Sequence, residues 1–287
     1  GLEVVESNTI VPVTVTSDKE EYSARTIRPK IWRQLDNFLD IDESFNEKFH
    51  FEEKALEVLK EFVEFKLKHY GLRNHPEQEY TSGLSGYLKY GFISPLTIYN
   101  YLQIYTEYLT DSFIEELVIR RDLSYNFVYY NEKYDHFKHM THSWAYLTMD
   151  IHRLDEREYL YTVEDYISFN THDVYFNAAM KEMVHLGAMH GYMRMYWGKK
   201  IIEWSSSYQK AYEIMITLNN YYFLDGNTPN GYAGVAWCFG KHDRAWNERM
   251  IFGKIRYMNQ NGLKRKFDID QYVQLIDRKV VEKNENI

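Results

Sequence analysis

The sequence predicts a predominantly α-helical domain preceded by a single β-strand. Apolar residues recur near the 3.6-residue period of a helix through most of the 287-residue chain. Only the stretch "NTIVPVTVTSD", residues 8–18, alternates Val and Thr in the manner of a strand. The hydrophobic share of 45% and the charged share of 26% are typical of a folded globular protein.

The helices are predicted from their periodicity and from the residues that begin and end them. The segment 49–72 carries apolar residues at Phe51, Ala55, Leu59 and Phe62 and closes at Gly71. Ser94 followed by Pro95 is typical of a helix start. Further helices are expected from residue 111 or 112 to 130 and over 164–169, 175–185, 190–204 and 205–223. Residues 225–240 are expected to form a glycine-rich loop in which short helical turns are allowed.

One strand cannot satisfy its own hydrogen-bonding groups. The stretch 8–18 therefore pairs with another chain or is the last strand of a domain that lies upstream, and we favour the upstream domain. The printed chain begins with Gly, so we expect the natural N-terminus to be missing.

The charge pattern gives the two ends of the chain opposite signs. The formal net charge of −8 argues against attraction of the whole chain to nucleic acid. Residues 36–64 hold ten acidic residues against three Lys, whereas residues 241–279 hold ten basic residues against five acidic ones. The stretch 241–279 is therefore the candidate polyanion-binding face.

Several classes of protein are disfavoured. The single cysteine, Cys238, excludes an intramolecular disulfide and a cysteine-based metal site, which fits a reducing intracellular compartment, cytoplasm or nucleus. No apolar run is long enough to span a bilayer, and no signal-peptide pattern is present. His185 and His190 are five residues apart and no HExxH occurs, so we expect no metal site.

Three local features suggest a site, each with a structural alternative. Arg194 lies within an apolar helix and must be paired, with Asp225 as the obvious partner; a purely structural ion pair explains this equally well. The loop "YTSGLSGYLKYGFIS", residues 80–94, could cradle phosphate oxygens or be an ordinary capped loop. The aromatic share of 17% suggests a planar ligand or a large core.

Several long segments taken together resemble the class II cyclobutane pyrimidine dimer DNA photolyases. The segments are "SGLSGYLKYGFISP", "EELVIRRDLSYNFVYYN", "REYLYTVEDY", "THDVYFNAAMKEMVHLGAMHGYMRMYWGKKIIEW" and "LDGNTPNGYAGVAWCFGKHDRAWNERMIFGKIRYMNQNGLKRKFD". The resemblance runs from about Ser17 to about Tyr272. It implies that residues 1–27 end an N-terminal α/β antenna domain, with the segment "VPVTVTSDKEEYSARTIRPK" as its last strand and the linker. Residues 28–70 would then hold a linker and the first helices, and residues 71–287 the helical domain that binds FAD and the DNA lesion.

The resemblance implies bound FAD in a folded-back form and light-driven repair of pyrimidine dimers flipped out of DNA. Arg194 and Asp225 would form a salt bridge beside the flavin ring, and Asn219 would lie near its N5, with Asn227 and Asn230 as rivals. The residues implied to hold the FAD phosphates, or to lie near the cofactor, are Tyr70, Thr81, Ser82, Gly83, Leu84 and Ser85.

The resemblance also implies how DNA is bound. Glu116 would hydrogen-bond the dimer, and Trp237 would form a wall of the lesion pocket. Trp246 with Arg244 would brace the gap left in the duplex. The residues implied to contact phosphates are Lys254, Arg256, Lys264 and Arg265. We expect a monomer that acts on dimer-containing DNA.

The sequence departs from the family pattern at two places. The family reduces its flavin through two Trp residues and a Tyr; Trp197 and Tyr161 match the ends of that relay, but the middle position is Phe176. Phe is hard to oxidise, so the relay is expected to be interrupted, with Tyr175 or Trp204 as substitutes. Gly83 and Gly86 replace bulkier residues in the phosphate loop. The alternatives are a cryptochrome-like flavoprotein that does not repair DNA, and a fragment that is inactive alone.

Overall fold

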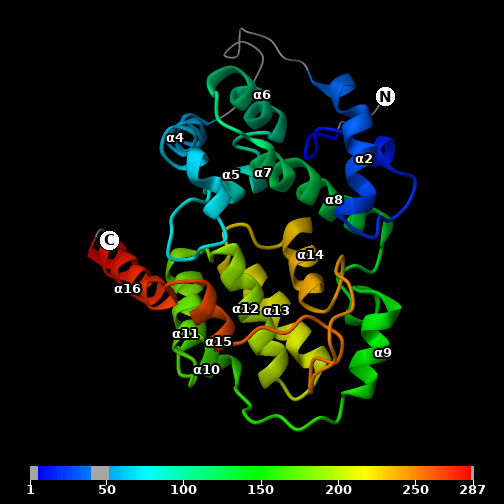
Figure 1. Cartoon of the computed structure of the whole chain (residues 1–287), viewed down its shortest axis with the longest axis vertical. Coiled ribbons are helices and arrows are strands. Elements are labelled where there is room, and N and C mark those ends of the chain that lie inside the picture. The colour runs from blue at the N-terminus through cyan, green and yellow to red at the C-terminus, as the bar shows by residue number, and fades with distance from the viewer. Residues whose placement is uncertain (1–5, 40–51, 286–287) are drawn as a thin grey trace. The chain divides into compact units, whose positions relative to one another are not determined.

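The computed structural model describes residues 6–39 and 52–285, and every regular element in these ranges is a helix (Figure 1). The first residues of the helix expected over 49–72 therefore lie outside the described part. The helices divide into two compact units. One unit comprises residues 1–73 and 80–132, and the other comprises residues 74–79 and 133–287.

The first unit is built from short helices around one apolar core. Its largest buried side chains include Phe62 and Phe127. The elements are α1 (Val13–Thr16), α2 (Ala24–Leu35), η1 (Asp36–Phe38), α4 (Glu53–Glu61), η2 (Phe62–Lys66), η3 (Leu67–Leu72), α5 (Ser85–Lys89), α6 (Pro95–Tyr105), α7 (Asp111–Ile114), η4 (Glu115–Arg120) and α8 (Arg121–Tyr130). The predicted start of α6 is confirmed, since the Ser94 hydroxyl accepts the Thr97 N–H at 2.9 Å and Pro95 is the first helical residue.

The strand predicted over residues 8–18 is wrong. Residues 13–16 form the helical turn α1, and the Glu6 carboxylate accepts hydrogen bonds from the Thr9 hydroxyl at 2.7 Å and from the Val13 N–H at 3.1 Å. Ile10 and Val11 are buried in the core of the first unit. The β-branched residues that suggested a strand thus fill a core, and a local carboxylate replaces the partner strand that this segment lacks.

The second unit surrounds α12 (Gly191–Trp204), which packs against α11 (Val174–Lys181), α13 (Tyr208–Tyr222) and α14 (Pro229–Cys238). Figure 1 shows these helices side by side. The remaining elements are η5 (Phe137–His139), α9 (Ser143–Ile151), α10 (Val163–Ile167), η6 (Glu182–Leu186), α15 (Gln260–Lys266) and α16 (Ile269–Glu285). Neighbours on three sides explain why α12 is apolar around most of its circumference.

The predicted loop over residues 225–240 is also wrong over most of its length. Residues 229–238 form the helix α14, begun by the Thr228 hydroxyl, which accepts the Gly231 N–H at 3.2 Å, and by Pro229. One of its glycines serves packing: a Cβ on Gly231 would lie 2.8 Å from Asn219 Nδ2. Bare backbone at that position lets α14 approach α13 closely.

No helix in ranges 6–39 and 52–285 has both the length and the apolar character needed to cross a bilayer. The same ranges contain no group of three His, Cys, Asp or Glu side chains placed to hold a metal ion.

Candidate flavin and DNA site

Arg194 and Asp225 form the ion pair that the sequence predicts. The Arg194 guanidinium donates to Asp225 Oδ1 at 2.7 Å and to the Met189 carbonyl at 3.3 Å, and it lies 3.8 Å from the centre of the Phe223 ring. The two side chains remain 28% and 18% exposed. The pair is therefore held in a fixed place while a ligand can still reach it.

The turn between α13 and α14 positions Asp225 and the candidate asparagines. Asn219 is buried at the end of α13, and its Nδ2 donates to Asn220 Oδ1 at 2.9 Å. The same Asn220 oxygen accepts the Asn227 N–H at 2.9 Å, which holds Asn227 at a positive φ of 54°. Asn227 and Asn230 are exposed, so of the three only Asn219 has a buried amide.

In the first unit, the loop Thr81–Ser85 leads into the short helix α5 with most of its side chains accessible. Ser82 Oγ accepts the Leu84 N–H at 3.4 Å, and Gly83 adopts a positive φ of 71° that favours glycine. Leu84 is buried and fixes the loop to the core of this unit. Thr81 and Ser85 are exposed, and each carries a hydroxyl group.

Tyr70 and Glu116 belong to the same unit, and the Arg73 guanidinium contacts both. Tyr70 is packed against Phe62 and Phe113, and burial raises the pKa of its phenol. The Arg73 guanidinium lies 5.1 Å from the Tyr70 ring centre and 3.1 Å from Glu116 Oε1. Arg73 thus binds one oxygen of the Glu116 carboxylate. The Glu116 side chain remains 43% exposed, so solvent or a ligand can still reach it.

Trp237, Trp246 and Arg256 form a cluster around one acidic residue. The Arg256 guanidinium lies 4.4 Å from the Trp246 ring centre and 5.6 Å from that of Trp237. Asp243 Oδ2 accepts hydrogen bonds from both Arg256 Nε and Trp246 Nε1 at 3.2 Å, and the Arg244 guanidinium lies 5.0 Å from the centre of the Trp246 ring. The sequence did not single out Asp243, because its role depends on a partner thirteen residues away.

A buried lysine fixes the end of α14 that carries Trp237. The Lys199 ammonium is fully buried and donates to the carbonyl of Cys238, one of the last carbonyls of that helix. Burial lowers the pKa of Lys199 to about 8. A cation at a helix C-terminus is favourable, and here it also ties α14 to α12.

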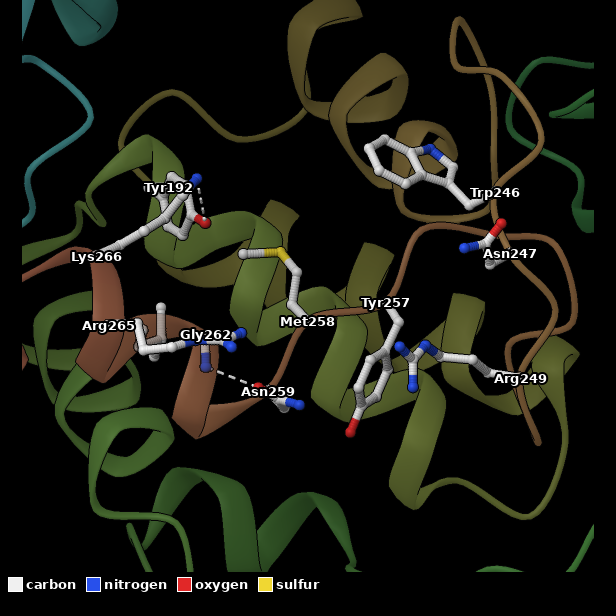
Figure 2. A pocket seen from close by; sticks show the side chains of 11 residues that line it. Tyr192, Trp246, Asn247, Arg249, Tyr257, Met258, Asn259, Gly262, Arg265 and Lys266 are labelled. Carbon is white, nitrogen blue, oxygen red and sulfur yellow. Dashed lines mark hydrogen bonds between the residues drawn. The ribbon is translucent and has the colours of Figure 1, made fainter.

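An open pocket of about 520 Å³ adjoins this cluster (Figure 2). In Figure 2, Arg249 lies against Tyr257 on one side and Lys266 against Tyr192 on the other, with cation-to-ring distances of 5.2 Å and 5.1 Å. The lining residues are Tyr192, Trp246, Asn247, Arg249, Tyr257, Met258, Asn259, Gly262, Leu263, Arg265 and Lys266. This lining combines three cations with aromatic rings and has no carboxylate, which suits a polyanion with planar bases.

Of the cations expected to contact phosphates, Arg265 lines the pocket, Arg256 belongs to the tryptophan cluster and Lys264 lies 5.6 Å from the Tyr175 ring. Lys254 is exposed, and its backbone carbonyl accepts the Trp246 N–H at 2.8 Å. The sequence did not identify Arg249, Tyr257 and Lys266 as site residues, although they fall within the basic stretch 241–279.

Comparison with known proteins identifies the family. The chain is 47% identical over 303 residues to the deoxyribodipyrimidine photo-lyase of Methanothermobacter thermautotrophicus, covering 95% of this chain and 67% of the relative. The chain belongs to the deoxyribodipyrimidine photo-lyase family. It is also 39% identical to the Potorous tridactylus photo-lyase and 38% identical to that of Oryza sativa subsp. japonica, and it spans 57% and 62% of their lengths.

A solved structure shares the fold of the photo-lyase chain at low sequence identity. A class III photolyase from Agrobacterium tumefaciens superimposes with a TM-score of 0.66 at 17% identity, covering 94% of this chain and 61% of that one. No protein-family model matches the sequence. The structural match to the class III photolyase confirms the helical fold that the resemblance predicts.

Three aromatic residues at or beside the expected relay, Phe176, Trp204 and Tyr161, lie in contact within the second unit, and Trp197 lies on the same helix as Trp204. Trp197 is buried and donates its indole N–H to Met180 Sδ at 3.1 Å. Phe176 packs on Trp204 at 5.1 Å between ring centres, and Trp204 packs on Tyr161 at 5.3 Å. Trp204 therefore touches both the interrupted middle position and the outer tyrosine.

Tyr175, the other suggested substitute for Phe176, contacts residues of α15 and α16. The Tyr175 hydroxyl donates to Asp270 Oδ1 at 2.8 Å, and its ring lies under Lys264. Tyr175 is thus occupied by contacts with α15 and α16. Trp204 is the better placed of the two to carry an electron towards Tyr161.

The stability of the second unit is expected to depend on pH through His142. Burial, reinforced by the charge of Lys241, lowers the pKa of His142 to about 4 from its ordinary 6.5. Because the unfolded chain then binds more protons, stability decreases as pH falls from about 6.5 towards 4. Over this pH window, the free energy of unfolding of His142→Gln should fall by about 1–3 kcal/mol less than that of the parent protein. This range takes into account that His142 is only half-buried. Urea unfolding of both proteins at pH 4.5 and pH 7 measures the difference.

His136→Gln is the control for this prediction, because His136 is an exposed histidine paired with Asp135 at 2.7 Å. It should not reproduce the smaller loss of stability expected of His142→Gln. An identical pH slope for the parent and for His142→Gln would show that His142 does not carry the effect.

Proposed function

We propose that this chain is the flavin-binding, lesion-binding part of a class II photo-lyase that repairs cyclobutane pyrimidine dimers in DNA with light. Membership of the family supports the reaction. The observation that carries the proposal for this chain is the cluster of Trp237, Trp246, Arg244 and Arg256 around Asp243, next to a cationic pocket. A flavoprotein that only senses light has no need for such a DNA-facing cluster.

The residues of the second unit fit a flavin ring. FAD, when bound and reduced, would supply the light absorption and the single electron that opens the dimer. Arg194 would place a fixed positive charge beside the ring and thereby favour its anionic form, while Asp225 holds the guanidinium in place. Asn219, whose amide is buried, is the preferred neighbour of N5, with Asn227 and Asn230 as the alternatives.

The loop Thr81–Ser85 would contact the phosphates of FAD. Thr81, Ser82 and Ser85 offer hydroxyl donors, and the backbone at Gly83 carries no side chain that would keep an oxygen away. Leu84 anchors this loop, and Tyr70 contributes an aromatic face.

The DNA contacts are divided between stacking and charge. Trp237 would stack on the flipped dimer, and Trp246 with Arg244 would occupy the gap in the duplex. Arg256 is already paired with Asp243, so its main effect is to hold the two indoles, and its remaining N–H groups would reach a phosphate. Lys254, Lys264 and Arg265 would contact phosphates directly.

Glu116 would stabilise the dimer with its carboxyl group protonated, because it then donates a hydrogen bond that strengthens as the dimer takes up an electron. Replacing it by Gln should lower the repair yield per absorbed photon about tenfold, the effect of one charge-assisted hydrogen bond. DNA affinity should change little. Glu107→Gln, an exposed charge-matched change in the same unit, should repair like the parent protein.

The test is to reconstitute the chain with FAD, reduce it, and illuminate it with an oligonucleotide that contains a thymine dimer. Disappearance of the dimer supports the proposal. Bound flavin without loss of the dimer would instead indicate a cryptochrome-like protein. A colourless chain that cannot be reconstituted would indicate a fragment that is inactive alone.

A further inference from the structure

The hydroxyl of Tyr161 is bound twice by a single residue, His172. Tyr161 Oη lies 2.8 Å from His172 Nδ1, and the backbone N–H of His172 donates to the same oxygen at 3.1 Å. The backbone contact uses a lone pair of the phenol oxygen and leaves its proton free. A neutral imidazole whose proton is on Nε2 therefore accepts the phenol proton at Nδ1.

This pair lies at the outer end of an aromatic column. On the inner side, the Tyr161 ring meets Trp204 at 5.3 Å, and the Tyr161 N–H donates to the Trp204 carbonyl at 3.4 Å. On the outer side, Tyr159 stacks on His172 at 4.0 Å. Trp204 is buried, whereas His172 is exposed, so the column leads from the interior to water.

We propose that His172 Nδ1 is the proton acceptor when Tyr161 is oxidised by Trp204. One electron moves from Tyr161 to the radical cation of Trp204, which becomes neutral again. The O–H bond of Tyr161 breaks as an N–H bond forms on Nδ1, leaving a neutral tyrosyl radical and an imidazolium. The exposed imidazolium then releases a proton to water.

The physical reason is the acidity of an oxidised phenol. A phenol that loses an electron without losing its proton becomes a very strong acid, so its oxidation is uphill unless a base is within hydrogen-bond distance. The nearby Asp173 carboxylate is already occupied: it accepts the Tyr196 hydroxyl and the backbone N–H groups of Tyr175 and Phe176. His172 is thus the base that the structure offers to Tyr161.

The His172 ring packs on Tyr159 and Trp204, with ring centres 4.0 Å and 5.1 Å away, but the loop that carries it is held by other contacts. Its loop is held by Thr171, whose hydroxyl donates to Asn177 Oδ1 at 2.7 Å, and by Asp173, which begins α11. The backbone N–H that holds the phenol remains in every variant. A change of the ring therefore leaves these loop contacts in place, and His172→Phe controls for the ring packing that is lost.

The proposal depends on the relay expected under the proposed function, so its test replaces the flavin by another oxidant. The flavin-free protein is flash-oxidised with a soluble ruthenium photo-oxidant, and the tyrosyl radical is followed by transient absorption in H₂O and D₂O. Subtracting the signal of Tyr161→Phe gives the part that belongs to Tyr161. Failure to bind FAD or to repair DNA leaves this measurement unaffected.

Two variants separate proton acceptance from packing. His172→Gln keeps a hydrogen-bond acceptor that is not a base, and His172→Phe keeps a flat ring against Tyr159. We expect the Tyr161 radical yield to fall about tenfold or more in both, with loss of the solvent isotope effect seen in the parent. His185→Gln, which lies beside Phe169, should behave like the parent. An unchanged yield and isotope effect in His172→Gln would overturn the proposal.

Discussion

Replacing Gly226 by Ala is expected to destabilise the second unit by about 2–4 kcal/mol, lowering its melting temperature by roughly 5–15 °C. A Cβ at this position would lie 2.3 Å from the Asn219 carbonyl oxygen and 3.0 Å from that of Phe223. Both are backbone atoms at the end of α13, so neither can turn aside as a side chain would. Relief of the clash has to move the turn that carries Asp225.

The variant should therefore also weaken the hold of Asp225 on Arg194 and reduce the affinity for flavin. Differential scanning calorimetry and urea unfolding measure the stability, and flavin titration measures the affinity. Gly234→Ala is the matched control, because a Cβ there meets no atom within 4 Å and helical Ala is favoured over Gly. Equal stability of Gly226→Ala and Gly234→Ala would refute this account of the turn.

Replacing Phe176 by Trp is expected to speed light-driven reduction of oxidised flavin more than tenfold, a lowering of the barrier by more than about 1.4 kcal/mol. Indole gives up an electron far more readily than the benzene ring of Phe. Phe176 is fully buried between Tyr166 and Trp204, with ring centres 5.2 Å and 5.1 Å away. A Trp at this position would continue the path to Trp204 and Tyr161.

The measurement is the rate of flavin bleaching under blue light with an external reductant. Phe176→Leu controls for altered packing and should not exceed the parent rate. Trp204→Phe added to Phe176→Trp should remove part of the gain, because Trp204 is the contact between this position and Tyr161. Equal rates for the parent and Phe176→Trp would show that the missing indole does not limit the relay.

Local signals in the sequence were reliable wherever short-range physics decides the structure. Ser94 with Pro95 begins α6, and the helix expected over 205–223 is present as α13, whose cap Ser207 accepts the Lys210 N–H at 3.1 Å. A hydroxyl that caps a helix acts on atoms three residues away, so its effect can be predicted without knowing the fold. The same holds for Arg194: a cation in an apolar helix needs a partner, and Asp225 provides it.

Patterns whose meaning depends on distant neighbours were misread. Residues 8–18 look like a strand because β-branched residues favour one, yet Ile10 and Val11 fill a helical core. The glycines of residues 225–240 look like a loop, yet Gly231 allows the close approach of α14 to Asn219. Propensity describes an isolated segment, and tertiary packing overrides it when burial gains more free energy.

The sequence by itself determined that this chain is helical and belongs to the photo-lyase family. Helical periodicity, capping residues and long family motifs each involve residues that are close together in the sequence, so they can be recognised without knowing the fold. Only the tertiary structure placed Asp243 between Arg256 and Trp246, and His172 on the hydroxyl of Tyr161. These contacts join segments that are 3 to 13 residues apart without a helical period to connect them. Their geometry is set by how loops pack on helices, and packing is a property of the whole folded unit.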